Sequence, residues 1–140
     1  KTVSISTAED LMALSESYKL DTWSEGLTVE LEADVSLEGV AFSPIASFGG
    51  TFHGNGHTIS GLSLSEGLSL AGLFQRVQKD ARIEDLNVSG TVKASSTCEA
   101  AGGLAGRNAG TIENCSFSGN IAGSSTTGGL VGQNLSLIHI

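Results

Sequence analysis

The 140-residue chain has only two cysteines, one proline and few aromatic residues. Cys98 and Cys115 are too few for a disulfide framework, and they lack the CxxC spacing that is typical of zinc sites. The cysteines therefore do not distinguish an oxidising from a reducing compartment. No run of eighteen apolar residues is present, so we expect no membrane span.

Basic residues are also scarce. Seven Lys and Arg are scattered among fifteen Asp and Glu, and the net charge is −8 at pH 7. Because phosphate binding needs clustered Lys and Arg, we expect no nucleic-acid partner. Nine of the acids lie in the first forty residues, and such an acidic, polar surface suits a soluble or secreted protein.

Glycine, by contrast, is abundant, with 19 residues, and 39% of the chain is hydrophobic. The length suits one domain that can bury a real core. Many Ser, Thr and Asn residues accompany the glycines. This composition favours an all-β protein built of short strands and many turns.

Two series of short segments recur along the chain, about every 25 to 30 residues. The first series is HTISGLSLS from His57, ARIEDLNVSGTV from Ala81 and GTIENCSFSGNIAG from Gly110. We align its apolar positions as Ile59, Leu62 and Leu64 with Ile83, Leu86 and Val88, and with Ile112, Cys115 and Phe117. The second series is AGLF, GGLAGR and GGLVGQ, in which Leu73, Leu104 and Leu130 are equivalent.

The spacing within each copy indicates strands. Apolar residues at i and i+2 are typical of a strand with one buried face, whereas a helix would need i+3 and i+4. The polar pairs after each isoleucine, Ser60-Gly61, Glu84-Asp85 and Glu113-Asn114, predict tight bends. Ser-Gly is expected to end the strand before a second short strand at Thr91-Val92 or Asn120-Ile121. A unit this small buries its apolar face only against copies of itself, so we predict a parallel β-solenoid.

We predict that residues 1–40 form an N-terminal cap on this stack. A capping box with Ser6 as N-cap and Glu9 three residues later predicts a helix over about 8–18. Alternation of Leu27, Val29 and Leu31, with Glu30 and Glu32 outward, predicts a strand, and Val35 and Leu37 begin the next one. The solenoid repeats then occupy 41–134. Residues 135–140, LSLIHI, match the translation of a sequencing-library adapter, so we interpret them as an artefact and exclude them.

Six segments of the chain together resemble bacterial GLUG-motif proteins. In order, they are STAEDLMAL, LEADVSLEGVAFSPI, FGGTFHGNGHTISGL, AGLF, GGLAGRNAGTIENCSFSGNIAG and GGLVGQN. The resemblance covers about residues 5–134. It implies a right-handed parallel β-helix on an exported, often multidomain, surface or secreted protein, some members being adhesin-like or associated with IgA-specific peptidases. It implies no catalytic motif. One departure is His53, where the family commonly has Asp in the pattern F-D-G-N-G-H.

Two histidines in GTFHGNGHTISG, His53 and His57, are the first candidate site. A zinc site needs three or four ligands, and no Asp, Glu or Cys lies between Ser43 and Ser65, so we expect no metal. We interpret Gly54-Asn55-Gly56 as a turn with positive φ and the histidines as polar residues on that bend.

Carboxylates raise a second possibility, a polysaccharide lyase or hydrolase built on a β-helix. The best local group is Asp80, Arg82, Glu84 and Asp85, with Glu113 one coil further along. Since stacked Glu84 and Glu113 also suit a solvated bend, we assign no catalytic residue. The calcium-binding nonapeptide GGxGxDxUx is missing, so we expect no dedicated calcium site and no cofactor.

Three other features of the sequence bear on ligand binding and disulfide formation. Only Tyr18 and Trp23 could offer an aromatic platform to a sugar, and packing in the cap is their other possible role. GGLAGR and GGLVGQ lack the Lys-Ser/Thr pair of a phosphate loop, so their glycines are assigned to tight corners and close stacking. Cys115 is interpreted as a small buried hydrophobe, and a bridge to Cys98 stays open for an oxidising compartment.

These observations favour a non-enzymatic structural or adhesion repeat module of an exported bacterial cell-surface protein, within a larger multidomain chain. The expected partner class is a host or cell-surface glycan or protein. The alternatives are a polysaccharide-active β-helix, motivated by the carboxylates, and a glycan-binding module, motivated by the Ser/Thr/Asn-rich surface.

Overall fold

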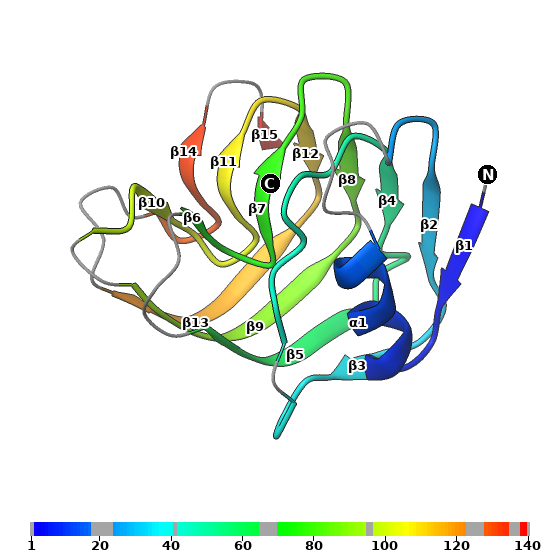
Figure 1. Cartoon of the computed structure of the whole chain (residues 1–140), viewed down its shortest axis with the longest axis horizontal. Helices are drawn as coiled ribbons and strands as arrows, with labels where there is room; N and C mark the ends of the chain where they lie inside the picture. The colour runs from blue at the N-terminus through cyan, green and yellow to red at the C-terminus, as the bar shows by residue number, and fades with distance from the viewer. Residues whose placement is uncertain are drawn as a thin grey trace.

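Neighbouring strands are parallel throughout the described part of the chain. The computed structural model describes residues 2–17, 24–40, 42–64, 70–94, 97–122, 128–134 and, for the backbone, 138–139. The chain winds into a β-solenoid of about four turns with one short helix, as the repeats predict (Figure 1). No helix in these ranges is long and apolar enough to cross a membrane.

Four parallel sheets form the walls of the solenoid. The largest has the order β1 (Thr2–Ile5), β2 (Thr28–Leu31), β4 (Thr51–His53), β8 (Arg82–Glu84), β12 (Thr111–Glu113) and β15 (Ile138–His139). A four-stranded sheet has the order β13 (Ser116–Ala122), β9 (Asn87–Lys93), β5 (Thr58–Leu64) and β3 (Val35–Ser36). Two smaller sheets contain β14 (Val131–Asn134), β11 (Ala105–Asn108) and β7 (Phe74–Val77), and β10 (Ala100–Ala101) with β6 (Leu70–Ala71).

Alternation along each strand sends apolar side chains into one continuous core. In the largest sheet, the inner positions Val29, Phe52, Ile83 and Ile112 are all fully buried. Phe52 also packs against Phe48 and Phe74, with ring centroids 6.2 and 5.5 Å away. Burial of apolar side chains from every coil is therefore the main stabilising contribution, since a single coil has no interior of its own.

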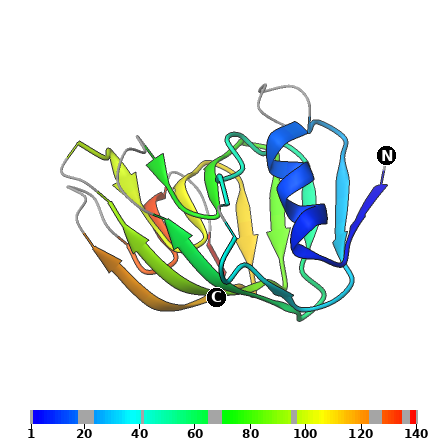
Figure 2. The ribbon, with the colours of Figure 1, turned by 60° about the horizontal axis from the view of Figure 1, so that its bottom comes forward.

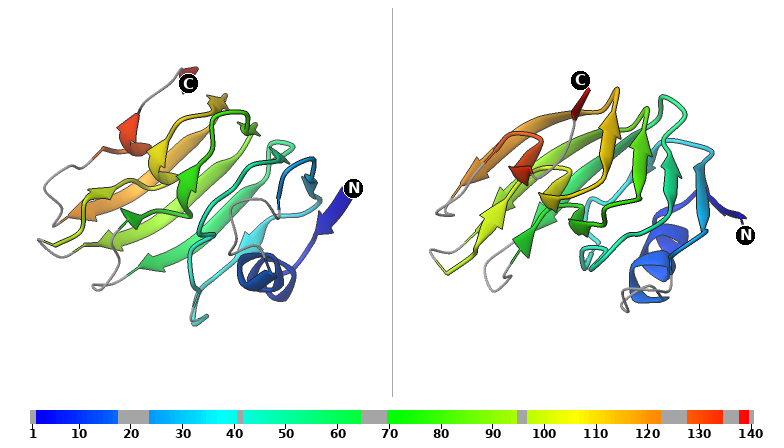
Figure 3. Two further views of the ribbon diagram at one scale, coloured as in Figure 1. Left: turned by 45° about the horizontal axis from the view of Figure 1, so that its top comes forward. Right: turned by 90° about the horizontal axis from the view of Figure 1, so that it is seen from above.

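The helix α1 (Ala8–Ser17) lies at the N-terminal end of the stack (Figure 3). Its Leu11 and Leu14 side chains are buried in the core. The predicted position of this helix is confirmed, but its predicted cap is wrong by one residue. Thr7 is the N-cap: its Oγ1 accepts a hydrogen bond from the Asp10 amide at 3.2 Å, and Asp10 Oδ2 accepts from the amides of Ser6 and Thr7. The box forms at Thr7 because β1 continues to Ile5, whose carbonyl still bonds to the next strand.

The strand predicted at Leu27, Val29 and Leu31 is confirmed as β2, and Val35 does begin β3. β1 is an additional strand that pairs with β2 in register from Thr2 to Ile5. At the other end of the sheet, β15 pairs with β12 through Ile138 and His139. The adapter interpretation of residues 135–140 stays a prediction.

Stacking in the second repeat series is confirmed. β7, β11 and β14 align Phe74 with Ala105 and Val131, which places Leu73, Leu104 and Leu130 one residue earlier in each coil. Gly102 of GGLAGR shows why glycine is needed here, because an added Cβ would lie 2.6 Å from the Gly132 amide nitrogen of the next coil. The expectation of close stacking at these glycines holds.

The alignment of the first repeat series is wrong for its first member. Ile83 pairs with Phe52 on one side and Ile112 on the other, while Ile59 pairs with Val88. The bend after Phe52 contains two more residues than the bend after Ile83, and a bulge after Ile59 adds another. These insertions let ISGLSL, which lies entirely on β5, imitate the spacing of IEDLNV, which runs from the end of β8 through a bend into β9.

The strands β9 and β13 run without interruption through the Ser-Gly pairs that were expected to end them. Gly90 has φ 152°, and a Cβ there would lie 2.1 Å from the Leu62 carbonyl oxygen. Glycine therefore permits close approach between coils within a continuous strand, rather than marking its end. The polar pairs do turn the chain at Asp85 and Asn114, which have positive φ.

Candidate functional site

A row of charged and polar side chains crosses the outer face of the largest sheet. The residues that alternate with the buried column point outward, and their strands are in register: Glu30 on β2, His53 on β4, Glu84 on β8 and Glu113 on β12. Together with Arg82, these residues form what we call the charged ladder. Glu30, His53, Glu84 and Glu113 each come from a different coil, so only stacking of the coils brings the ladder together.

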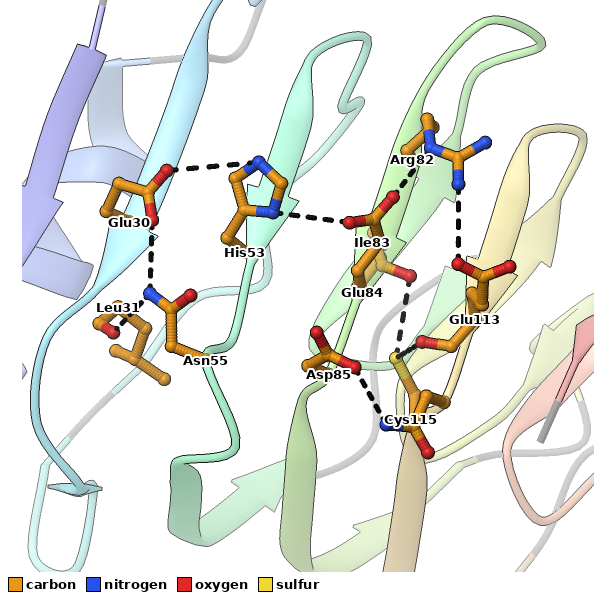
Figure 4. A network of polar contacts seen from close by, with 11 residues as sticks. Glu30, Leu31, His53, Asn55, Arg82, Ile83, Glu84, Asp85, Glu113 and Cys115 are labelled. Atoms are coloured by element: carbon orange, nitrogen blue, oxygen red, sulfur yellow. Dashed lines mark hydrogen bonds and ion pairs between the residues drawn. The ribbon is translucent and has the colours of Figure 1, made fainter.

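His53 lies between two carboxylates of the charged ladder (Figure 4). Its Nε2 atom is 3.8 Å from Glu30 Oε2, and its Nδ1 atom is 3.3 Å from Glu84 Oε1. Arg82 extends the contacts, with Nε 2.7 Å from Glu84 Oε2 and a terminal nitrogen 3.5 Å from Glu113 Oε1. The ladder thus joins four coils through side-chain contacts.

Electrostatics within the ladder are those of an exposed network. The hydrogen bond from Arg82 to Glu84, followed by the charges of Glu84 and Glu113, raises the pKa of the guanidinium. The Arg82 side chain is nevertheless 46% exposed, and exposed ion pairs contribute little to stability because water and salt screen them. The ladder therefore contributes little to the stability of the fold, and its main effect is to make this outer face charged.

Asn and Asp side chains at the adjacent bends form a second row of contacts. Asn55, Asp85 and Asn114 occupy this bend in successive coils, with φ of 55, 54 and 53°. Asn55 Nδ2 donates to Glu30 Oε1 at 3.1 Å and to the Leu31 carbonyl at 3.0 Å, while Asn114 Nδ2 donates to Asp85 Oδ1 at 2.7 Å. Sequence reasoning missed this alignment, although Asn and Asp are the residues that, after glycine, best tolerate positive φ.

The two predicted histidines have different surroundings. His57 follows the Gly54-Asn55-Gly56 turn, as expected, and its amide donates to the Gly54 carbonyl at 2.9 Å. Its Nδ1 atom lies 3.2 Å from Asp34 Oδ1, which also accepts from the Thr58 amide at 2.9 Å. The Thr58 hydrogen bond, and then His57, lower the pKa of Asp34.

His53, by contrast, is the last residue of strand β4 rather than part of the bend. The interpretation of both histidines as residues of the bend is therefore wrong for His53, because the strand pairing of β4 extends through it and directs its side chain toward Glu30 and Glu84. Among the described residues, no three His, Cys, Asp or Glu side chains lie close enough together to hold a metal ion. His53 and its two carboxylate neighbours form a linear row, not a coordination sphere.

The four residues of the candidate carboxylate cluster, Asp80, Arg82, Glu84 and Asp85, lie before, on and after strand β8. Arg82 and Glu84 lie on the strand, and Glu113 is beside Glu84 one coil later, as expected. Asp85 begins the bend after the strand and bonds to Asn114. Asp80 precedes the strand and lines a polar hollow of about 500 Å³ with Lys79, Glu25 and the glycine turn Gly49-Gly50.

Both cysteines are buried thiols. Cys115 Sγ donates weakly to the carbonyls of Glu113 and Ile83, and burial raises its pKa to about 11. Cys98 Sγ lies 3.2 Å from the Ala100 carbonyl oxygen. Cys115 matches Leu86 in the register, as predicted, but not Leu62, which lies opposite Gly90. Tyr18 and Trp23, the candidate aromatic platform, lie outside the described residues.

Comparison with known proteins gives this arrangement a family context. Residues 97–122, which span β10 to β13, match the model of the GLUG motif. The chain carries a GLUG repeat. The resemblance drawn from the sequence is therefore confirmed, and the matched segment is the coil whose Ile112 and Cys115 close the described core.

The chain is also similar to halomucin from Haloquadratum walsbyi, with 34% identity over 141 residues, which cover 92% of this chain. The aligned part is 2% of halomucin, so the chain spans a very small share of that relative's length. No solved structure matched the chain. The GLUG repeat and the similarity to a very large protein fit a repeat module of a surface protein.

Proposed function

We propose that this chain is a non-enzymatic structural or adhesion module of an exported, extracellular or cell-surface protein, and that it acts within a larger multidomain chain. The observation that supports this most directly is the stack itself: parallel ladders run from β1 to β12 across consecutive coils, over one continuous core. A solenoid of this kind is a stiff element whose outer faces repeat from coil to coil.

The charged ladder is consistent with a displayed surface rather than a reaction centre. Its carboxylates are partly exposed, and Arg82 lies between Glu84 and Glu113, at 2.7 and 3.5 Å. A general acid needs a carboxyl whose proton is retained by burial or by a like charge. Glu84 and Glu113 are instead only partly buried, and both are paired with the Arg82 guanidinium at the surface.

Two assays on the same purified chain test the proposal. A glycan array measures binding, and a reducing-sugar assay on soluble polysaccharides measures turnover. Binding without turnover supports an adhesion role, and silence in both assays supports a spacer. Turnover that disappears in Glu84→Gln, but persists in the matched Glu38→Gln control, would identify a polysaccharide-active β-helix and overturn the proposal.

A further inference from the structure

The outer face of the four-stranded sheet carries hydroxyl and amide side chains in rows. Three long strands, β5, β9 and β13, lie side by side there (Figure 2). We call nine of their outward positions, those before the last row of Lys93 and Ala122, the hydroxyl face: Thr58, Asn87 and Ser116; Ser60, Ser89 and Ser118; Ser63, Thr91 and Asn120. The first and third rows are aligned residue by residue, and Ser60 lies in the bulge opposite Ser89.

None of the nine side chains is charged, in a chain with 22 charged residues. Charge occurs at the margins of the face, at Lys93, the outward residue that ends β9, at Glu38 beside Gly61, and at Asp34, whose carboxylate accepts a hydrogen bond from the Thr58 amide. The outer face of the largest sheet differs sharply, because it carries the charged ladder. Because one outer face is charged and the other is not, the two faces favour partners of different charge.

Several groups of the hydroxyl face are available to a ligand. Ser63, Ser118 and Asn120 are exposed, and Ser89 and Thr91 are half-buried. Within the described part of the chain, no hydrogen bond joins the side chains of these five residues to another group. Elsewhere on the face the groups bond internally, as where Ser116 Oγ donates to Asn87 Oδ1 at 2.6 Å.

The chemistry of this face identifies its partner. A charged polymer would find no opposite charge there, and an apolar surface would leave the hydroxyl groups without hydrogen bonds. A protein interface usually centres on aromatic residues, Met or Arg, and none of these belongs to the face. Hydroxyl groups both donate and accept, so the matching partner is another uncharged surface rich in hydroxyl groups.

We propose that the hydroxyl face binds an extended, uncharged polysaccharide that lies along its rows, across the strands. This inference rests on the adhesion part of the proposed function. Neighbouring strands are about 4.8 Å apart, so each coil presents a similar trio of polar groups at each step along the solenoid axis. Each contact is weak because water competes for it, and affinity comes from many contacts made at once.

Depletion by insoluble neutral polysaccharides tests the assignment. The purified chain is mixed with cellulose, chitin or mannan, and with alginate beads as a polyanion, and the unbound fraction is measured. We expect retention on at least one neutral polymer and none on alginate. Ser118→Asp and Asn120→Asp place a charge on exposed positions of the face and should lower retention at least fivefold. Thr111→Asp on β12 is the matched control on the other face and should retain wild-type binding.

The outcomes separate this inference from the proposed function. If all three variants bind as the wild type does, or lose binding equally, the face is wrongly assigned although adhesion stands. If no neutral polymer retains the chain, the inference is overturned and the spacer role survives. Release of reducing ends would overturn the non-enzymatic function, and the variant series would still decide the face. Equal thermal midpoints of all variants verify that folding is unchanged.

Discussion

Phe52 of β4 and Ile83 of β8 lie side by side in adjacent parallel strands, and neither side chain is exposed. Ile83 is paired in turn with Ile112. The core is thus a column that crosses the coils, and each member is packed between the members before and after it. Removal of one side chain from the middle of the column leaves a cavity that neither neighbour can fill by a change of rotamer alone.

We expect Ile83→Ala to destabilise the protein by about 2–5 kcal/mol, because it removes buried methyl groups and opens a cavity in this column. Urea unfolding followed by circular dichroism measures the change. Thr111→Ala, on the outward side of the neighbouring strand, is the control and should stay within about 0.5 kcal/mol of the wild type. An unchanged Ile83→Ala midpoint would contradict the buried column.

We expect Gly90→Ala to cost about 2–3 kcal/mol, because the new methyl group would meet the Leu62 carbonyl of the preceding coil at 2.1 Å. Gly56→Ala separates contact from backbone strain. Gly56 has φ 80° but open space around it, so alanine there should cost about 1 kcal/mol from conformation alone. Equal losses in the two variants, measured by urea unfolding, would argue against close approach at Gly90.

Thr7→Ala should destabilise the protein by about 1 kcal/mol, because it removes the side-chain acceptor of the Asp10 amide at the start of α1. Ser6→Ala is the matched control. The contact of Ser6 with Asp10 uses the backbone amide, which alanine keeps. A larger loss in Ser6→Ala than in Thr7→Ala would restore Ser6 as the N-cap.

Asp34 should make stability depend on pH in the acid range. The Thr58 amide and His57 lower the pKa of this carboxyl below its usual 3.8, so the folded state favours the ionised form. The resulting stabilisation is present above about pH 4 and is lost as pH falls through the lowered pKa. Thermal midpoints at pH 6 and pH 3 should differ less in Asp34→Asn than in the wild type.

Asp10→Asn tests a second, independent source of the same acid sensitivity. The Ser6 amide, and then Thr7, lower the pKa of Asp10, so this variant should remove a separate share of the acid sensitivity. Because the two carboxylates accept hydrogen bonds from different amides, the two losses should add in the double variant. A midpoint difference in Asp34→Asn identical to that of the wild type would show that the Asp34 hydrogen bonds do not persist in solution.

Cys115 should resist thiol reagents in the folded protein. Burial raises its pKa to about 11, so little thiolate is present near pH 8. In a Cys98→Ser background, we expect slow labelling by iodoacetamide at pH 8 and rapid labelling after addition of urea. Fast labelling of the folded variant would contradict the burial of Cys115, and non-reducing mass spectrometry of the wild type tests the bridge to Cys98.

The local structure could be predicted from the sequence where short-range patterns determine it. Alternation around Leu27, Val29 and Leu31 predicted β2, and helical spacing after the N-terminal box predicted α1. The equivalence of Leu73, Leu104 and Leu130 was also visible, because the glycines around these residues fix the length of each corner. Small repeating units of this kind bury their apolar side chains only by stacking, so the solenoid itself followed from the sequence.

The register between coils was decided by the tertiary structure. The longer bend after Phe52 and the bulge after Ile59 both insert residues into the same coil, and the sequence pattern does not reveal them, so it could not show that Ile59 pairs with Val88. Pairing depends on contacts between residues far apart in the chain, and a local alignment does not measure them. The place of His53 between Glu30 and Glu84 depends on this register, and so does the alignment of the hydroxyl face along β5, β9 and β13.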